Sequence, residues 1–177
     1  MNTIRLVIEL CLMRGRTQDF PTGMRYVWFT GVTSAVIDLF SLPAAEMEIG
    51  HVLFIASQVM LFGAAMWAML KLRGVPERWM QTVTALYAAN VVFSLLLLPF
   101  VPALSELVRQ GANGVPGWEA YASLVLSVWF LAVMARVVRE ATDWPLGLSL
   151  LATFTCVAFV RIVGVVLAPA FGLQVGV

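Results

Sequence analysis

The sequence has few charged residues: they make up 12% of its 177 residues, whereas soluble domains carry about 25%. Hydrophobic residues make up 61%, and the mean hydropathy is +0.91. Five apolar stretches of about 20 residues leave no room for a separate soluble domain, so any chemistry must lie in a membrane or at its surface. The formal net charge of +1 gives no support to nucleic-acid binding. We therefore expect an integral membrane protein without a nucleic-acid partner.

Residues that carry catalysis are also scarce. The single histidine, His51, excludes haem held by two histidines of this chain, and the nearest serine, Ser57, has no glycine-rich elbow around it. The sequence has no cluster with metal-ligand spacing and no Walker loop, and Asp38 stands alone where a proton pump usually has a chain of carboxylates. We expect no enzyme, metal or cofactor, although a partner subunit could complete a site.

Five apolar stretches are long enough to cross a membrane as helices of about 20 residues. They cover residues 26–43, 51–70, 79–98, 118–138 and 145–168. The pattern predicts an all-α polytopic protein, with a cytoplasmic amphipathic arm over residues 1–25, a five-helix transmembrane domain over 26–168 and a short outer tail over 169–177. In the longest outer loop, residues 99–117, we expect one or two helical turns over 103–110.

The basic residues are sorted between alternate loops. Nine of the 11 fall in the arm, between stretches two and three, or where stretch four meets stretch five. The opposite loops hold four glutamates and one base, Arg109. Cytoplasmic loops collect Lys and Arg during insertion. We therefore expect a multi-pass protein of the inner (cytoplasmic) membrane with its N-terminus in the cytoplasm and its C-terminus outside.

The arm has apolar residues at helical spacing, and Arg5 and Glu9 interrupt its apolar run, which argues against a cleaved signal peptide. The spacing predicts a short amphipathic helix in the inner interface, with Arg5, Arg14 and Arg16 at lipid headgroups. The alternative is that this helix packs against the bundle. Cys11 in the arm and Cys156 in the fifth stretch are expected to lie too far apart for a disulfide.

Two charges lie well inside the predicted spans, away from the span ends. Asp38 and Arg161 are about 18 and about 24 Å from the inner ends of their stretches, at ~1.5 Å per residue. Similar depths predict an ion pair that neutralises both charges and fixes the packing of the first and fifth helices. In the alternatives, Arg161 meets a lipid phosphate, a quinone or a partner helix, or extends to the outer surface.

Gln58 and Asn90 are the other strongly polar residues inside the spans. Each amide needs a partner in the hydrocarbon region, and the two could meet near the midplane. We interpret them first as interhelical packing contacts and second as a ligand site. Small residues in the first and second spans indicate close helix approach: Gly31, Ser34, Ala35, Gly63, Ala64 and Ala65.

Residues 71–90, KLRGVPERWMQTVTALYAAN, resemble the glycine-containing cytoplasmic turn and third span of the Yip1 family of small membrane proteins. Trp129 and the polar turn at residues 139–143 resemble that family's fourth-to-fifth junction, so the resemblance covers residues 19–168. The acidic-aromatic motif DLYGP of the eukaryotic members is not found. The resemblance implies a helical bundle without known catalytic residues that acts in membrane organisation or partner binding, and it transfers no site residues.

Two functions remain. The first is a non-enzymatic scaffold or accessory subunit that binds membrane lipids and other membrane proteins or a second copy of itself. The alternative is a small carrier or channel, which requires Asp38, Gln58, Asn90 and Arg161 to line one cavity.

Overall fold

The computed structural model describes residues 3–41, 48–110 and 115–173, and within these ranges all regular elements are helical. The all-α prediction is therefore confirmed. The α-helices are α1 (Thr3–Cys11), α2 (Met24–Phe40), α3 (Ile49–Arg73), α4 (Trp79–Leu97), α5 (Val101–Gln110), α6 (Trp118–Thr142) and α7 (Leu146–Leu167). Short 3₁₀ turns lie between or after them: η1 (Thr17–Asp19), η3 (Pro76–Arg78), η4 (Leu98–Phe100) and η6 (Ala168–Phe171).

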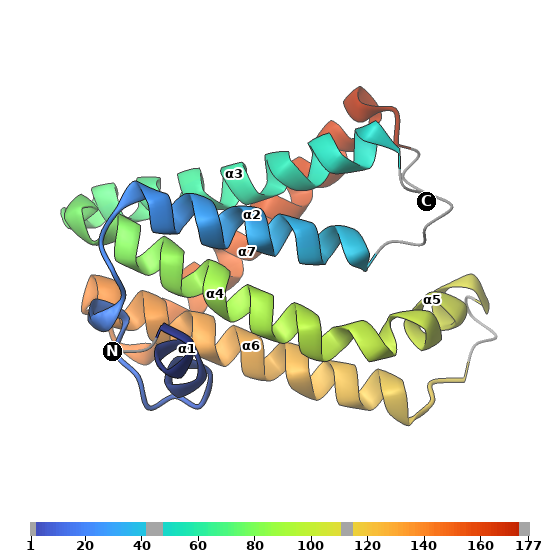
Figure 1. Cartoon of the computed structure of the whole chain (residues 1–177), viewed down its shortest axis with the longest axis horizontal. Coiled ribbons are helices and arrows are strands. Elements are labelled where there is room, and N and C mark those ends of the chain that lie inside the picture. The colour runs from blue at the N-terminus through green and yellow to red at the C-terminus, as the bar shows by residue number, and fades with distance from the viewer. Residues whose placement is uncertain (1–2, 42–47, 111–114, 174–177) are drawn as a thin grey trace.

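Four helical segments of the described chain are long and apolar enough to cross a membrane, which indicates a membrane protein. They are Ile49–Arg73, Pro76–Gln110, Trp118–Thr142 and Leu146–Phe171, and they coincide with four of the five predicted stretches. The remaining stretch contains α2, whose 17 residues run beside α3 and α4 (Figure 1). Because its predicted end, Pro43, lies outside the described residues, the fifth span stays a prediction.

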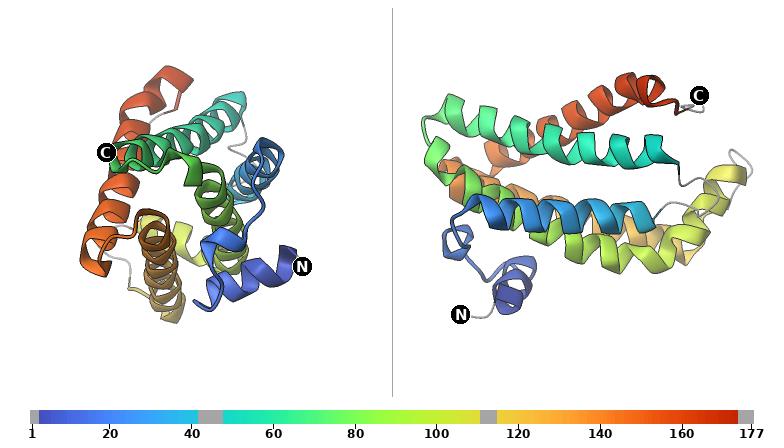
Figure 2. Two further views of the ribbon diagram at one scale, coloured as in Figure 1. Left: turned by 90° about the vertical axis from the view of Figure 1, so that its left-hand side faces the viewer. Right: turned by 45° about the horizontal axis from the view of Figure 1, so that its top comes forward.

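Helix α4 is the centre of the bundle. Its residues 82–89 are all buried, and it packs against α2 on one side and α6 on the other. Helix α7 packs against α3 and α6 (Figure 2). The bundle is therefore arranged around α4: α2 packs directly on α4, whereas α7 packs on α3 and α6.

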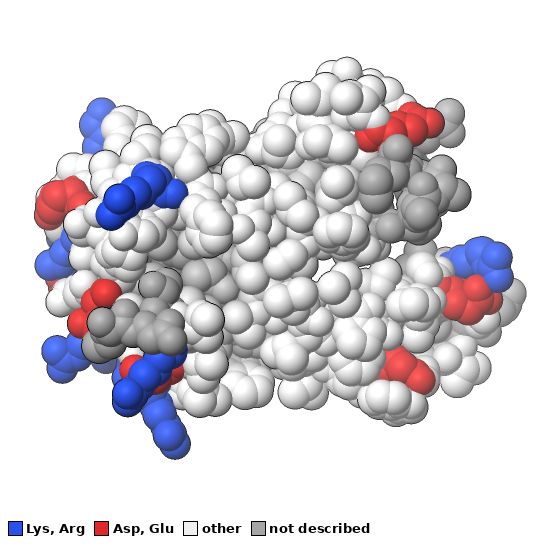
Figure 3. All heavy atoms as spheres, viewed as in Figure 1, with Lys and Arg blue, Asp and Glu red and all other residues white. Residues whose placement is uncertain are grey.

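Two helical hairpins close at the same end of the bundle (Figure 1). Helix α3 ends where Gly74 adopts a left-handed φ of 84°, and the Val75 amide then donates to the Leu70 carbonyl, as in a Schellman cap. Helix α6 ends similarly at Asp143, with a φ of 57°. In the view of Figure 3, Lys and Arg side chains gather around this end, whereas Arg109 lies on α5 at the opposite end.

At the opposite end, α4 continues through η4 into α5. Pro99 lies in η4, and because proline has no backbone N–H, it cannot make the helical hydrogen bond at this point, where the helical path takes a 3₁₀ turn. The predicted short helix is present as Val101–Gln110, and Glu106 and Arg109 form an ion pair of 2.6 Å on it. The glycine-rich residues that follow, 111–114, lie outside the described part of the chain.

The N-terminal arm is docked on the bundle. Leu6, Leu10 and Cys11 of α1 are buried against α4 and α6, which agrees with the alternative of packing against the bundle. Ile4 and Ile8 on another side of α1 are exposed, so a position at the lipid interface stays a prediction.

Polar contacts hold the arm on α6. The backbone amide and the hydroxyl of Thr17 donate to one carboxylate oxygen of Glu140 at 2.7 and 2.9 Å. Arg136 binds the other oxygen of Glu140 at 3.0 Å and also donates to the Gly15 carbonyl. The Trp129 indole donates to the Cys11 carbonyl at 3.0 Å. These contacts fix α1 beside the bundle.

Candidate intramembrane polar site

The four polar residues predicted within the spans line one cavity of about 180 Å³. Asp38 comes from α2, Gln58 from α3, Asn90 from α4 and Arg161 from α7. The other lining residues are Ser34 and a mostly apolar set: Val59, Phe62, Leu86, Tyr87, Phe130, Met134, Val157 and Val160. The cavity therefore places two opposite charges and two amides in a largely apolar surrounding.

Asp38 is held by α4. The Ser94 hydroxyl donates to one carboxylate oxygen at 2.8 Å, and the Asn90 amide nitrogen lies 3.2 and 3.4 Å from the two oxygens. The same Asn90 nitrogen donates to the Ser34 hydroxyl at 2.8 Å. Sequence reasoning identified Ser34 only as a small packing residue and missed Ser94. The signal was their spacing, because Ser34 precedes Asp38 by one helical turn and Ser94 follows Asn90 by one turn.

Arg161 lines the same cavity but does not bind Asp38 directly. Its charge acts electrostatically on the Asp38 carboxylate, yet within the described ranges Arg161 forms no ion pair within 4 Å and no hydrogen bond. The structure thus differs from the predicted direct ion pair. The physical reason is the helix arrangement, because α2 packs on α3 and α4 whereas α7 packs on α3 and α6, and the cavity lies between the two charges.

Gln58 is pressed against α7. A Cβ atom added to Gly164 would lie 2.8 Å from the Gln58 amide oxygen, so glycine provides the room that this side chain needs. The amide nitrogen of Gln58 is buried and has no hydrogen-bond partner among the described residues. An unsatisfied buried donor costs about 1–3 kcal/mol, so this amide favours any acceptor that enters the cavity.

Tyr87 forms the wall between the cavity and the outside of the bundle. Its hydroxyl donates to the Val59 carbonyl, and its ring and hydroxyl fit against Gly31 and Gly63, where added Cβ atoms would lie 3.2 and 2.8 Å away. Two of the small residues that indicated close helix approach therefore accommodate an aromatic side chain from α4.

The cavity is suited to a small polar guest. A water molecule takes ~30 Å³ of liquid, and typical ligand pockets measure roughly 300–1,000 Å³, so about 180 Å³ holds a few waters, an ion or a small solute. No group of three His, Cys, Asp or Glu residues that could hold a metal ion occurs in the described part of the chain.

No protein-family model, curated protein or solved structure matches this chain. The Yip1 resemblance therefore stays an expectation, and a function has to be inferred from the chemistry of the site itself.

Proposed function

We propose that this protein is a non-enzymatic membrane protein that binds a small polar solute or ion inside its helical bundle, as a small carrier or channel does. The observation that carries the proposal is the convergence of Asp38, Gln58, Asn90 and Arg161 on one cavity. Had these side chains faced separate neighbours, the carrier function would have failed.

The free hydrogen-bonding capacity of the cavity supports the same function. A network built only for packing would satisfy its own donors, as the Asn90, Ser94 and Asp38 contacts do. The guanidinium of Arg161 and the amide nitrogen of Gln58 are instead left without a partner among the described residues. Both groups donate, so the guest we expect carries an acceptor such as a carboxylate, phosphate or other anionic oxygen.

Binding is tested by thermal unfolding of the purified protein in detergent with glycine, acetate, inorganic phosphate or chloride as probes. A guest at 100 times its Kd stabilises the folded state by about 2.7 kcal/mol. We expect at least one probe to raise the Tm of the parent protein and to have no effect on Arg161→Gln. The control Arg109→Gln, which removes an exposed charge from α5, should keep the full response. If no probe raises the parent Tm, this function is wrong.

A scaffold or accessory subunit is the second candidate, favoured by a groove of about 620 Å³ along α2 and α3. Its lining includes Ala35, Ala56 and Ala64, and small residues of this kind let a helix from another protein approach closely. A stoichiometric companion that copurifies with the parent protein but not with Ala64→Trp would support this function. Recovery of the parent without any companion argues against it.

We further propose that α2 is the first of five spans in the inner membrane, with the N-terminus cytoplasmic and the C-terminus outside. The gathering of basic side chains at the hairpin end supports this orientation (Figure 3). In the arm, Arg14 and Arg16 are exposed and available to headgroups, whereas Arg5 pairs with Glu9 at 2.7 Å. With both native cysteines replaced, an impermeant thiol reagent should label Val115→Cys but not Gly74→Cys in intact cells. The reverse pattern would overturn the orientation.

A further inference from the structure

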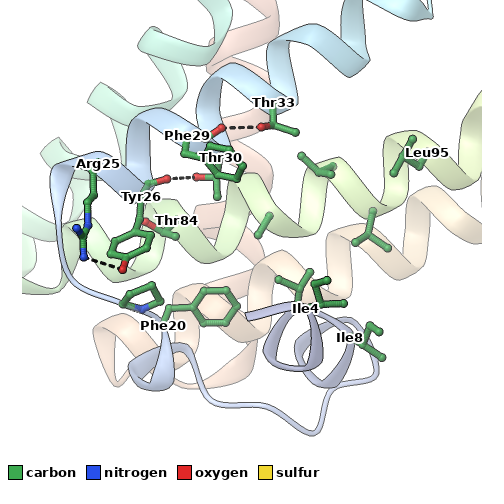
Figure 4. A pocket seen from close by; sticks show the side chains of 15 residues that line it. Ile4, Ile8, Phe20, Arg25, Tyr26, Phe29, Thr30, Thr33, Thr84 and Leu95 are labelled. Atoms are coloured by element: carbon green, nitrogen blue, oxygen red, sulfur yellow. Dashed lines mark hydrogen bonds between the residues drawn. The ribbon is translucent and has the colours of Figure 1, made fainter. Parts of the chain in front are cut away.

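A second, larger hollow opens on the side of the bundle where the arm docks (Figure 4). It is a groove of about 880 Å³ with α4 as its floor, α2 as one wall and α1 as the other. The hydroxyls of Thr30 and Thr33 donate to carbonyls of their own helix at 2.8 and 2.7 Å, so they are satisfied. The lining is otherwise mostly apolar and includes Ile8, Phe29, Ala88, Val91, Val92 and Leu95.

One end of this groove carries a positive charge. Arg25 lies at the start of α2, at the hairpin end of the bundle, and its guanidinium stacks on the Tyr26 ring at 4.7 Å and donates to the Tyr26 hydroxyl at 2.9 Å. It is exposed and forms no ion pair with an acid of the described residues. A guanidinium at the headgroup level is suited to a phosphate.

Below this charge the groove contains an unsatisfied hydroxyl. The side chain of Thr84 is 2% exposed, and its oxygen has no hydrogen-bond partner among the described residues, although a helical threonine can donate to its own helix as Thr82 does. Thr84 lies five residues into α4, or about 7.5 Å along the helix. The interfacial layer of each leaflet is roughly 5–7 Å thick, so with the start of α4 at the membrane surface this hydroxyl would lie near the level of lipid ester carbonyls.

We propose that this groove binds one glycerophospholipid with an anionic headgroup. The phosphate binds Arg25, an ester carbonyl accepts a hydrogen bond from Thr84, and an acyl chain runs along Val91 and Leu95 of α4. This site is separate from the polar cavity and does not depend on the function proposed for it. Helix α1 forms one wall, so the docked arm shapes the lipid site as well as covering the bundle.

The groove along α2 and α3 provides a contrast within the same molecule. It is similarly apolar and lies across α2 from the first groove, but the charged residue of its lining is Glu77. A carboxylate at the rim repels an anionic headgroup. The difference in charge favours the α1–α2–α4 groove for an anionic lipid.

The test is native mass spectrometry of the detergent-solubilised protein with added phosphatidylglycerol or phosphatidylcholine. A lost hydrogen bond to a charged group weakens binding by about 10-fold or more, so Arg25→Gln should lower the occupancy by phosphatidylglycerol by at least that factor. The control Arg139→Gln removes an exposed charge at the same end that does not line the groove, and it should have little effect. Equal losses in both variants would show a general attraction of anionic lipid and overturn the site.

A second pair of variants separates lipid binding from folding. Thr84→Val removes a hydroxyl that has no partner among the described residues, so the lipid-free variant should be at least as stable as the parent while it binds phosphatidylglycerol about 3-fold to 10-fold more weakly. Thr82→Val, on the same helix, should lose stability but keep its lipid affinity. Unchanged affinity in Thr84→Val, or equal binding of phosphatidylcholine and phosphatidylglycerol by the parent, would contradict the proposal.

Discussion

The hydrogen bonds of Asp38 lead to a prediction about which residues depend on one another for stability. In the structure its carboxylate is bound by Asn90 and Ser94, whereas Arg161 acts on it only at longer range. Hydrogen bonds to a charged group contribute about 1.5–3 kcal/mol. Asp38→Ala also removes the acceptor of the Ser94 hydroxyl, whereas the Asn90 amide keeps the Ser34 hydroxyl as an acceptor. We therefore expect Asp38→Ala and Asn90→Ala each to lower the free energy of unfolding by about 1–3 kcal/mol.

Double-mutant cycles decide between this network and a direct ion pair. Residues that share a network have interaction energies of 0.5–3 kcal/mol, whereas independent sites add within about 0.5 kcal/mol. We expect the Asp38→Ala and Asn90→Ala pair to be strongly non-additive. Arg161→Ala should cost less than about 1 kcal/mol, because Arg161 forms no ion pair or hydrogen bond among the described residues, and it should be nearly additive with Asp38→Ala.

The assay is unfolding by SDS in mixed micelles, followed by tryptophan fluorescence, for the parent, the three single variants and the two double variants. If the Asp38 and Arg161 changes prove more strongly coupled than the Asp38 and Asn90 changes, the charges form a direct pair in the membrane, and the description of the network is incorrect.

Three further predictions concern other contacts. Glu140→Gln weakens the charge-assisted hydrogen bonds from Thr17, so the arm should detach from α6 more often and trypsin should cleave it faster than in the parent. An unchanged cleavage rate would mean that these bonds do not hold the arm on the bundle. Burial raises the pKa of the Cys11 thiol from 9.0 to about 11. Because iodoacetamide reacts with the thiolate, it should modify Cys11 at pH 8 about 100-fold more slowly in the folded protein than in the unfolded protein, and the rate in the folded protein should rise until the pH passes 11. Fast labelling of the folded protein at pH 8 would show that the thiol is not buried. Gly63→Ala places a Cβ 2.8 Å from the Tyr87 hydroxyl, and this clash should destabilise the protein by about 1–3 kcal/mol, offset by up to ~1 kcal/mol because alanine favours the helix more than glycine does. Adding Tyr87→Phe to this variant should relieve the clash. Equal melting temperatures for all variants would show that there is no clash.

Local features of the fold could be predicted from the sequence. The turn at Gly74 and Pro76, the apolar helices and the short helix before Gln110 follow from periodicity and helix-breaking residues, which act within a few positions of the chain. The four polar residues were also identifiable, because polar groups are rare within apolar stretches.

Tertiary neighbours could not be predicted in the same way. The expected contact of Asp38 with Arg161 assumed that the first and last spans were adjacent, whereas the structure packs α2 on α3 and α4. The contact of Glu140 with Thr17 joins residues 123 positions apart, and no periodic signal reports such a pair. The fit of the Tyr87 ring and hydroxyl against Gly31 and Gly63 also joins helices that are distant in the sequence, and no local pattern predicts it.

The central claim is that the polar cavity admits a solute from water, and thiol accessibility tests it most directly without a known substrate. In a chain with Cys11 and Cys156 replaced by alanine, Val160→Cys places a thiol in the cavity wall, and Phe159→Cys places one on the exposed apolar surface of the same helix. We expect an impermeant, charged thiol reagent added to intact membranes to label Val160→Cys and to leave Phe159→Cys unlabelled. Failure to label Val160→Cys from either side of the membrane would show that the cavity is closed to water and that its polar residues serve packing alone.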